Sequence, residues 1–408
     1  MLRQDETFLT NVAAGSPGAT NTDNAGNTSP DAKSNLVSGN ILITSRPINS
    51  VTATARYRYF EYQNDLPTHA FTNTVAQNGN VTTGTFTTTA NNYTKQNAGM
   101  DIGWRPLRQV SFKAGYEYEH WYRSDVDDKS FGTSEHIGKA AVDVTPNDWI
   151  LGRVTYIYGN RNLEGYGVDP LAGNGPGFLK FNYADRVRNR VDALLQLSRW
   201  ETFTPSLNFG YAYDNFTNSA FGLTDDANFS AGVSLSWTPL QWLTFSADYT
   251  YEHHDATQRI RGGADLNAFE TASKDDFHIV SVGSIVEVIP KKLDFNLSYG
   301  VTFGYTKIEN SNLYPGCVGQ ACAFDYSKIQ NVLQTARFVG RYRLTEKLSF
   351  RGGFAYERYN ERNFARDPMA PFMGYYDTSL AGAQSVYLGA TVPNYESYTL
   401  AGFVRYDF

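Results

Sequence analysis

Apolar and polar residues alternate over long stretches of this chain, and most stretches follow a tight break that contains proline. After Pro239, apolar residues occupy every second position, namely Leu243, Phe245, Ala247, Tyr249 and Tyr251. Successive side chains of a β-strand point to opposite faces, so this pattern predicts a strand with one apolar and one polar face. The same split recurs after Pro106 and Pro290. The repeating unit is therefore predicted to be a long β-hairpin.

The alternation and the clusters of Gly, Pro and Asn together predict fifteen strands that follow one another as a meander. They are residues 33–46, 50–63, 92–105, 109–123, 133–145, 149–162, 183–199, 206–216, 226–238, 242–255, 274–289, 293–307, 329–343, 348–361 and 395–408. A weak, short sixteenth strand is predicted at residues 2–10. The expected organisation is a single β-barrel domain over 1–408, with a weak first strand and a long loop in 1–32 and a hairpin-repeat barrel in 33–408.

The predicted connections alternate in length. Short ones lie at Pro47, Pro106, Pro146, residues 200–205, Pro239, Pro290 and residues 344–347, whereas the others are mostly long and rich in Asn, Gly, Asp and Thr. Alternate connections of a meander lie at opposite ends, so all the tight turns should meet at one rim. Short periplasmic turns and long extracellular loops are typical of a transmembrane β-barrel. The last strand should run toward the short-turn side.

Composition is compatible with that class. The chain has 408 residues, 19% of them charged and 15% aromatic, and its mean hydropathy is −0.43. No stretch has the roughly 18 consecutive apolar residues that a transmembrane helix needs, whereas a barrel commits only every second residue to lipid. The net charge of −6 gives no sign of a nucleic-acid-binding surface. The first residues show no signal peptide, so we expect that it was removed or that the chain begins inside a longer one.

A soluble β-sandwich also has one apolar and one polar face. Three features favour the barrel: long uninterrupted strands, loops at one end, and aromatic clusters at the predicted strand ends. These clusters comprise Tyr57, Tyr59, Tyr156, Tyr158, Tyr211 and Tyr213. We therefore predict an all-β, transmembrane, antiparallel up-and-down β-barrel of about 16 strands in a bacterial outer membrane. Its lipid-facing belt should include Phe112, Tyr116, Phe245, Tyr249, Phe295 and Phe350.

The two cysteines, Cys317 and Cys322, lie close together in a predicted exterior loop. A local disulfide is the leading interpretation, because two thiols without a nearby histidine supply too few ligands for zinc. The CxxCH pattern of covalently attached haem does not occur in the sequence. No nucleophile elbow, phosphate-binding loop or dinucleotide fingerprint stands out, so neither an enzyme nor a bound cofactor or metal is expected.

Charged residues on the polar faces of the strands are predicted to line a lumen, because charge is costly against lipid. A hydrated wall is one interpretation, and a wall shaped to hold a partner or to select a charged solute is the other. The predicted lumen-facing set is Arg56, Arg58, Lys113, Glu117, Glu119, Arg153, Arg186, Arg188, Arg190, Asp248, Glu252, Arg337, Arg341, Arg351 and Glu357.

The last strand ends in an aromatic pattern that includes Tyr406 and Phe408, similar to the C-terminal assembly signal of bacterial outer-membrane barrels. The segments GRYRLTEKLSFRGGFAYERY from Gly340, NFARDP from Asn363 and VYLGATVPNY before the last strand resemble the MtrB/PioB family of decahaem-associated outer-membrane proteins. The resemblance is clearest over residues 234–408.

Membership would imply a porin-like sheath that holds a periplasmic multihaem c-type cytochrome, so that electrons cross the outer membrane. An extracellular cytochrome would be a candidate second partner. The haem would belong to the partner. Because family members have more strands, a C-terminal portion or a shortened member is expected. The alternative is a free-standing diffusion porin for small charged solutes, in which a long loop folds inward to narrow the bore.

Overall fold

A computed structural model of the chain describes residues 2–4, 32–67, 70–75, 81–87, 90–126, 129–165, 179–260, 268–313, 323–363, 372–375, 384–387 and 394–407. All its regular elements are strands, and no helix in these residues could cross a membrane. The strands are β1 (Leu2–Gln4), β2 (Ala32–Ile48), β3 (Val51–Asp65), β4 (Ala70–Val75), β5 (Val81–Thr87), β6 (Asn92–Leu107), β7 (Val110–Val126), β8 (Lys129–Val144), β9 (Ile150–Glu164), β10 (Arg186–Leu197), β11 (Phe203–Asn215), β12 (Gly222–Leu240), β13 (Leu243–Ile260), β14 (Phe269–Ile289), β15 (Leu293–Asn312), β16 (Ile329–Arg343), β17 (Leu348–Arg362), β18 (Phe372–Tyr375), β19 (Gln384–Tyr387) and β20 (Tyr395–Tyr406).

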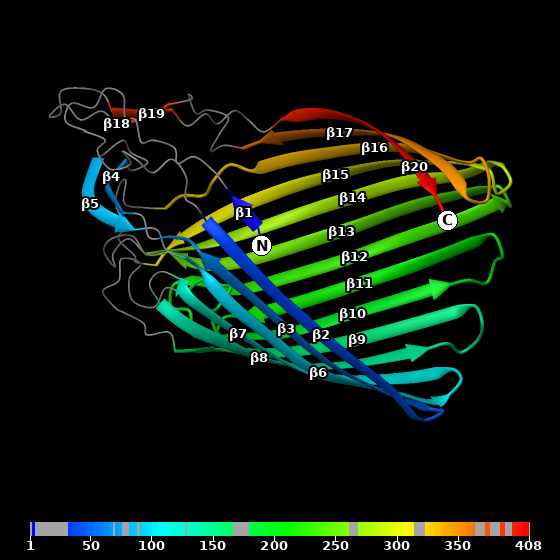
Figure 1. The fold of residues 1–408 in the computed structure, drawn as a ribbon, viewed down its shortest axis with the longest axis horizontal. Coiled ribbons are helices and arrows are strands. Elements are labelled where there is room, and N and C mark those ends of the chain that lie inside the picture. The colour runs from blue at the N-terminus through cyan, green and yellow to red at the C-terminus, as the bar shows by residue number, and fades with distance from the viewer. Residues whose placement is uncertain are drawn as a thin grey trace.

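One antiparallel sheet of sixteen strands forms the body of the molecule, in the order β1-β2-β3-β6 and then β7 to β17 in sequence, followed by β20. This is the predicted up-and-down meander. Figure 1 shows the sheet curling round, with the short turns at one end and the strand ends that lead into the long connections at the other. Within the described residues β20 pairs only with β17, and β2 pairs with β1 and β3, so the two edges do not pair with each other. Two small hairpins that the sequence did not predict, β4–β5 and β18–β19, lie in long connections.

The prolines of the short-turn rim do not all end a strand. Pro47, Pro106 and Pro239 lie inside β2, β6 and β12, each at a break in the pairing register two to three residues before the turn. Proline cannot donate to a sheet ladder, and a β-bulge leaves a residue unpaired, so a bulge accommodates the ring. The same type of bulge therefore occurs three times along the short-turn rim.

Several predicted strand boundaries were wrong, and two regions illustrate this. A long loop was expected between residues 123 and 133, but β7 runs to Val126 and β8 starts at Lys129. The strand predicted to start at residue 183 starts at Arg186, because the residues before it form a turn in which Ala184 donates its backbone N–H to the Lys180 carbonyl. The predicted alternation of short and long connections therefore has an exception at β7–β8.

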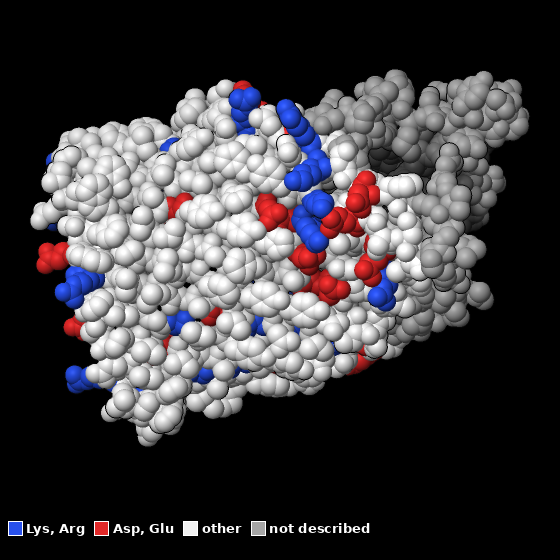
Figure 2. Space-filling model, turned by 180° about the vertical axis from the view of Figure 1, so that it is seen from behind, with Lys and Arg blue, Asp and Glu red and all other residues white. Residues whose placement is uncertain are grey.

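An uncharged band covers the outer face of the sheet next to the short turns. On each of the seven strands that leave a short turn, the first five outward-facing positions hold no charged residue. The six residues predicted to form a lipid-facing belt all lie in this band: Phe112, Tyr116, Phe245, Tyr249, Phe295 and Phe350. Figure 2 shows the outer surface from behind, where charges gather toward the long-connection end and the middle is almost free of them.

Tyrosine pairs mark the far border of the band. They are the seventh and ninth residues of β3, β7, β9 and β13, for example Tyr116 with Tyr118 and Tyr249 with Tyr251. In two of these pairs the first tyrosine contacts a histidine. The Tyr116 hydroxyl lies 2.6 Å from His136 Nδ1, and the Tyr249 hydroxyl lies 2.9 Å from His278 Nδ1. The prediction that such rings lie at strand ends is confirmed for Tyr211 and Tyr213, near the end of β11. It was wrong for the pairs of β3 and β9, because those strands continue beyond them. Rings at this level are typical of a membrane interface.

Candidate functional site

All fifteen charged residues predicted to face a lumen share one face of the sheet. The pairing register places them opposite the Phe112 and Phe245 face, which is the outer one, and so on the inner face. The remaining pairs of neighbouring strands continue the same alternation to β17. In the part of the strands next to the short turns, the charged side chains therefore lie mainly on the inner face. This face is the candidate functional surface.

Carboxylates neutralise most of the inner cations on β7 to β11. Near the short turns, Asp143 accepts from both Lys113 (2.9 Å) and Arg153 (2.6 Å). Farther along, Arg190 donates to Asp192 at 2.8 and 2.9 Å. These two groups of residues form the lower part of a ladder of acidic and basic side chains that runs along the inner wall.

The upper part of this ladder is buried. Asp214 accepts two hydrogen bonds from Arg188 (2.7 and 2.5 Å) and one from Arg186 (3.3 Å), and Arg186 also donates to Glu135 at 2.6 Å. The side chain of Asp214 is only 8% exposed. A buried charge is stable only with partners of opposite sign. The predicted Arg186, Arg188 and Arg190 row is thus largely part of the wall's own structure.

A second cluster joins β3, β6 and β7. Arg56 forms ion pairs with Asp101 and with Glu117. Asn97 donates to Glu117 (3.0 Å) and to Glu119 (2.8 Å). The carboxylates that sequence reasoning missed, such as Asp101, Asp143 and Asp214, occupy alternate strand positions, but only the register shows which arginine each one faces.

Three inner arginines differ from the rest. Arg58, Arg337 and Arg351 are exposed, and none has an ion-pair partner within the described part of the chain. They lie on β3, β16 and β17, each of which is the second or third strand from an edge of the sheet. Their charge is available to a molecule that enters from the inner side. We refer to them as the free arginines.

The other predicted residues have local partners or none. Arg341 donates to Asp294 at 2.9 Å, Asp248 accepts from Ser281 at 3.1 Å, and Glu357 accepts from Tyr395. Glu252 has no polar partner among the described side chains. Each of these residues stands separately from the ladder.

The adjacent histidines His253 and His254 face opposite sides, as expected for neighbours in a strand. His253 lies 2.9 Å from Asp276 on the outer face. On the inner face, His254 lies between Asp226 (2.8 Å) and Asp275 (3.3 Å). In the described residues no group of three or more potential ligands could hold a metal ion.

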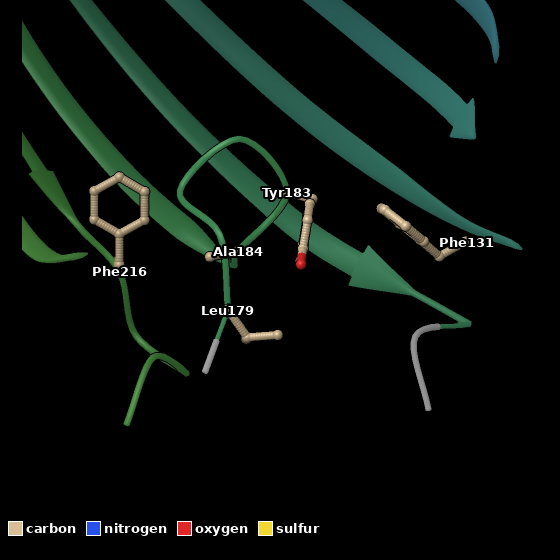
Figure 3. Packing of buried hydrophobic residues seen from close by; sticks show 5 residues of the cluster. All are labelled: Phe131, Leu179, Tyr183, Ala184 and Phe216. Atoms are coloured by element: carbon tan, nitrogen blue, oxygen red, sulfur yellow. The ribbon is translucent and has the colours of Figure 1, made fainter. Parts of the chain in front are cut away.

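The segment Leu179–Asp185, which follows the described end of β9 and precedes β10, folds against the inner face. We refer to it as the inner shelf. Its residues Leu179, Tyr183 and Ala184 are almost fully buried against Phe131 and Phe216, and Figure 3 shows these five side chains together. The rings of Tyr183 and Phe131 lie edge to face at 4.8 Å. This is the main apolar cluster of the described residues.

Two inner arginines hold the inner shelf by its backbone. Arg161 donates to the carbonyls of Phe181 (2.6 Å), Asn182 (3.4 Å) and Ala184 (2.9 Å). Arg123 donates to the Asn182 carbonyl at 3.4 Å, and its guanidinium lies 3.8 Å from the centre of the Trp121 ring. Charge-assisted hydrogen bonds of this kind are stronger than neutral ones. The inner shelf is therefore fixed to the wall.

Three predicted site residues cannot be placed. Cys317, Cys322 and Phe408 lie outside the described residues, so the disulfide and the terminal aromatic residue stay predictions. Tyr406 is the last residue of β20 and pairs with Leu348.

Comparison with known proteins adds three findings. A family model described as outer membrane beta-barrel porin, MtrB/PioB, matches residues 1–408. The outer membrane protein MtrB of Shewanella baltica (strain OS185) is 24% identical over 344 residues, which cover 83% of this chain and 47% of that protein. The chain thus spans about half the length of this relative.

Solved structures give weaker likenesses. The copper transporter OprC aligns over 81% of this chain and 62% of its own, with 8% identity and a TM-score of 0.35. The siderophore receptor PirA from Acinetobacter baumannii aligns over 92% and 74%, with 7% identity and a TM-score of 0.36. Neither is close enough to carry an argument about this protein.

Proposed function

Because this chain belongs to the MtrB/PioB family of outer-membrane β-barrel porins, we propose that it forms the wall of a sheath for a periplasmic multihaem c-type cytochrome. The sheath would hold the cytochrome across the outer membrane, and electrons would pass through the haems of the partner to the exterior, where an extracellular cytochrome would be a second partner. No cofactor is assigned to the chain itself.

The observation that carries this proposal is the division of the inner charges. The ladder on β7 to β11 uses its arginines within the wall, whereas Arg58, Arg337 and Arg351 are exposed and free of described partners. Exposed guanidinium groups recognise carboxylates, including those of acidic side chains and haem propionates. The free arginines therefore suit a partner with an acidic surface.

Charge reversal at the free arginines tests the proposal. In the full-length protein expressed with its native locus, all three should be replaced by Glu, and a matched variant should carry Lys at the same positions. The Glu variant should lose bound haem absorbance at a lower salt concentration than the wild type, because like charges then face each other. The Lys variant should retain its haem.

Equal haem retention in all three proteins at every salt concentration would refute the proposal. Substitution of Arg186 and Arg188 would be a poor test, because it would place carboxylates against Asp214 and disturb the wall itself.

One observation favours a diffusion porin as the second candidate. The inner shelf narrows the space enclosed by the sheet and stands beside charged walls, as in a solute-selective constriction. Single-channel recording of the purified protein separates the two functions. If the purified protein forms an open, ion-selective pore and its native membrane contains no associated cytochrome, the diffusion porin replaces the sheath as the proposed function.

A further inference from the structure

The inner shelf carries one large apolar side chain that the described part of the fold leaves exposed. Phe181 is 64% exposed, although its carbonyl accepts a 2.6 Å hydrogen bond from Arg161. Leu179 and Tyr183, the apolar neighbours on the same segment, are buried at 5% and 2% exposure. The backbone is thus fixed while the ring is left uncovered.

The surroundings of Phe181 are polar. Among the described large apolar residues that β7 to β11 and the inner shelf place on the inner side, Phe181 is the only one that is largely exposed. The wall beneath it holds the paired charges of Arg186, Arg188 and Asp214. An exposed aromatic ring in a charged wall is unfavourable in water, so a covering partner would stabilise it.

The position of the inner shelf restricts what that partner can be. Arg161 lies three residues beyond Tyr158, and Arg123 lies five residues beyond Tyr118, counted away from the short turns. The inner shelf therefore lies beyond the tyrosine border, near the long-connection end of the enclosed space. Lipid on the outer face cannot reach it, because the sheet lies between them. A molecule inside the sheet can therefore cover the ring.

We propose that the inner shelf is a fixed contact site for the polypeptide held inside the sheath, and that Phe181 packs against an apolar surface near the exterior end of that polypeptide. This inference rests on the proposed function. It adds which residue of the wall contacts the partner and at what height along the barrel the contact lies. A planar haem edge or an aliphatic side chain on the cytochrome has the chemistry to cover the ring.

Site-specific photo-crosslinking tests the contact directly. A benzophenone amino acid replaces Phe181 in the full-length protein, in cells that express the native locus. Two further positions serve as references: Arg337 on the inner face and Tyr116 on the outer face. After irradiation, haem-dependent peroxidase staining of a denaturing gel reveals any covalent product that contains cytochrome.

The expected result is a haem-positive product from positions 181 and 337 and none from position 116. A product from position 337 but not from 181 would overturn the inner-shelf contact and leave the sheath standing. No haem-positive product from either inner position, in barrels that assemble normally, would instead overturn the proposed function.

A second pair of variants separates a partner contact from a solute constriction. Phe181→Ala should lower the salt concentration at which the cytochrome is released, and Phe181→Trp should preserve retention because it keeps an aromatic surface. If Phe181→Ala leaves cytochrome retention unchanged but raises the conductance of the empty barrel, the inner shelf is a pore constriction and the contact proposal fails.

Discussion

Replacing Leu297 by arginine should destabilise the membrane-inserted barrel strongly. Leu297 is the fifth residue of β15, so it lies midway between Leu293 at the short-turn rim and Val301 at the far border of the uncharged band. Its side chain faces outward opposite Ser284 and Phe338 and is 44% exposed. At a rise of about 3.4 Å per residue and a tilt of about 40°, each border is roughly 10 Å away along the membrane normal.

The expected magnitude follows from that depth. An arginine on the lipid face costs about 2–4 kcal/mol at the midplane and about 0–1 kcal/mol near the interface. Leu297→Arg should therefore lower the free energy of unfolding by roughly 2–4 kcal/mol, and Val301→Arg by about 1 kcal/mol or less. Asn296→Arg is the matched control, because Asn296 faces the inner side.

The assay is equilibrium unfolding of the protein in lipid vesicles, followed by tryptophan fluorescence and by the altered gel mobility of folded barrels. Equal losses for Leu297→Arg and Asn296→Arg would refute the assignment of faces. Equal losses at Leu297 and Val301 would refute the depth of the band. A water-soluble monomer that shields Leu297 in a closed core would refute both.

Three further predictions concern other parts of the chain. Asp214→Asn should cost about 3 kcal/mol in the same unfolding assay, since it removes a buried carboxylate that pairs with both Arg186 and Arg188. The more exposed Asp192→Asn should cost about 1 kcal/mol or less, and similar losses at the two positions would contradict the buried ladder. Mass spectrometry of non-reduced peptides should find Cys317 linked to Cys322, and two free thiols in the exported protein would disprove the pairing. Deleting Phe408 should reduce the amount of protein assembled in the outer membrane, measured by cell fractionation, and undiminished assembly would remove its role as a signal.

The sequence alone predicted the strands well where each strand has two unlike faces. Between the short turns and the tyrosine border, one face is apolar and the other polar, so the alternation has a period of two. Beyond the border both faces are polar, and the pattern no longer marks a strand. For this reason β13 was predicted to end at residue 255 and β15 at residue 307, although they continue to Ile260 and Asn312.

The inner shelf could not be predicted for a related reason. Leu179, Phe181 and Tyr183 alternate with polar residues, as they would in a strand. Their true position depends on Arg161 and Arg123, whose hydrogen bonds to the backbone of the inner shelf cannot be inferred from spacing. The ion pairs of the wall could not be predicted either, because the register between strands, and not the distance in sequence, decides which residues pair.

The strands that continue past the tyrosine border determine the electrostatic surroundings of the mouth. Asn312 lies eleven residues beyond Val301 on β15, and its neighbour Phe269 is paired with it. At the same rise and tilt, that end of the wall stands about 28 Å above the border. The Debye length at physiological ionic strength is about 8 Å. The negative potential of lipid headgroups is thus screened before it reaches the mouth along β14 and β15, and the charge that an arriving molecule meets there is that of the protein.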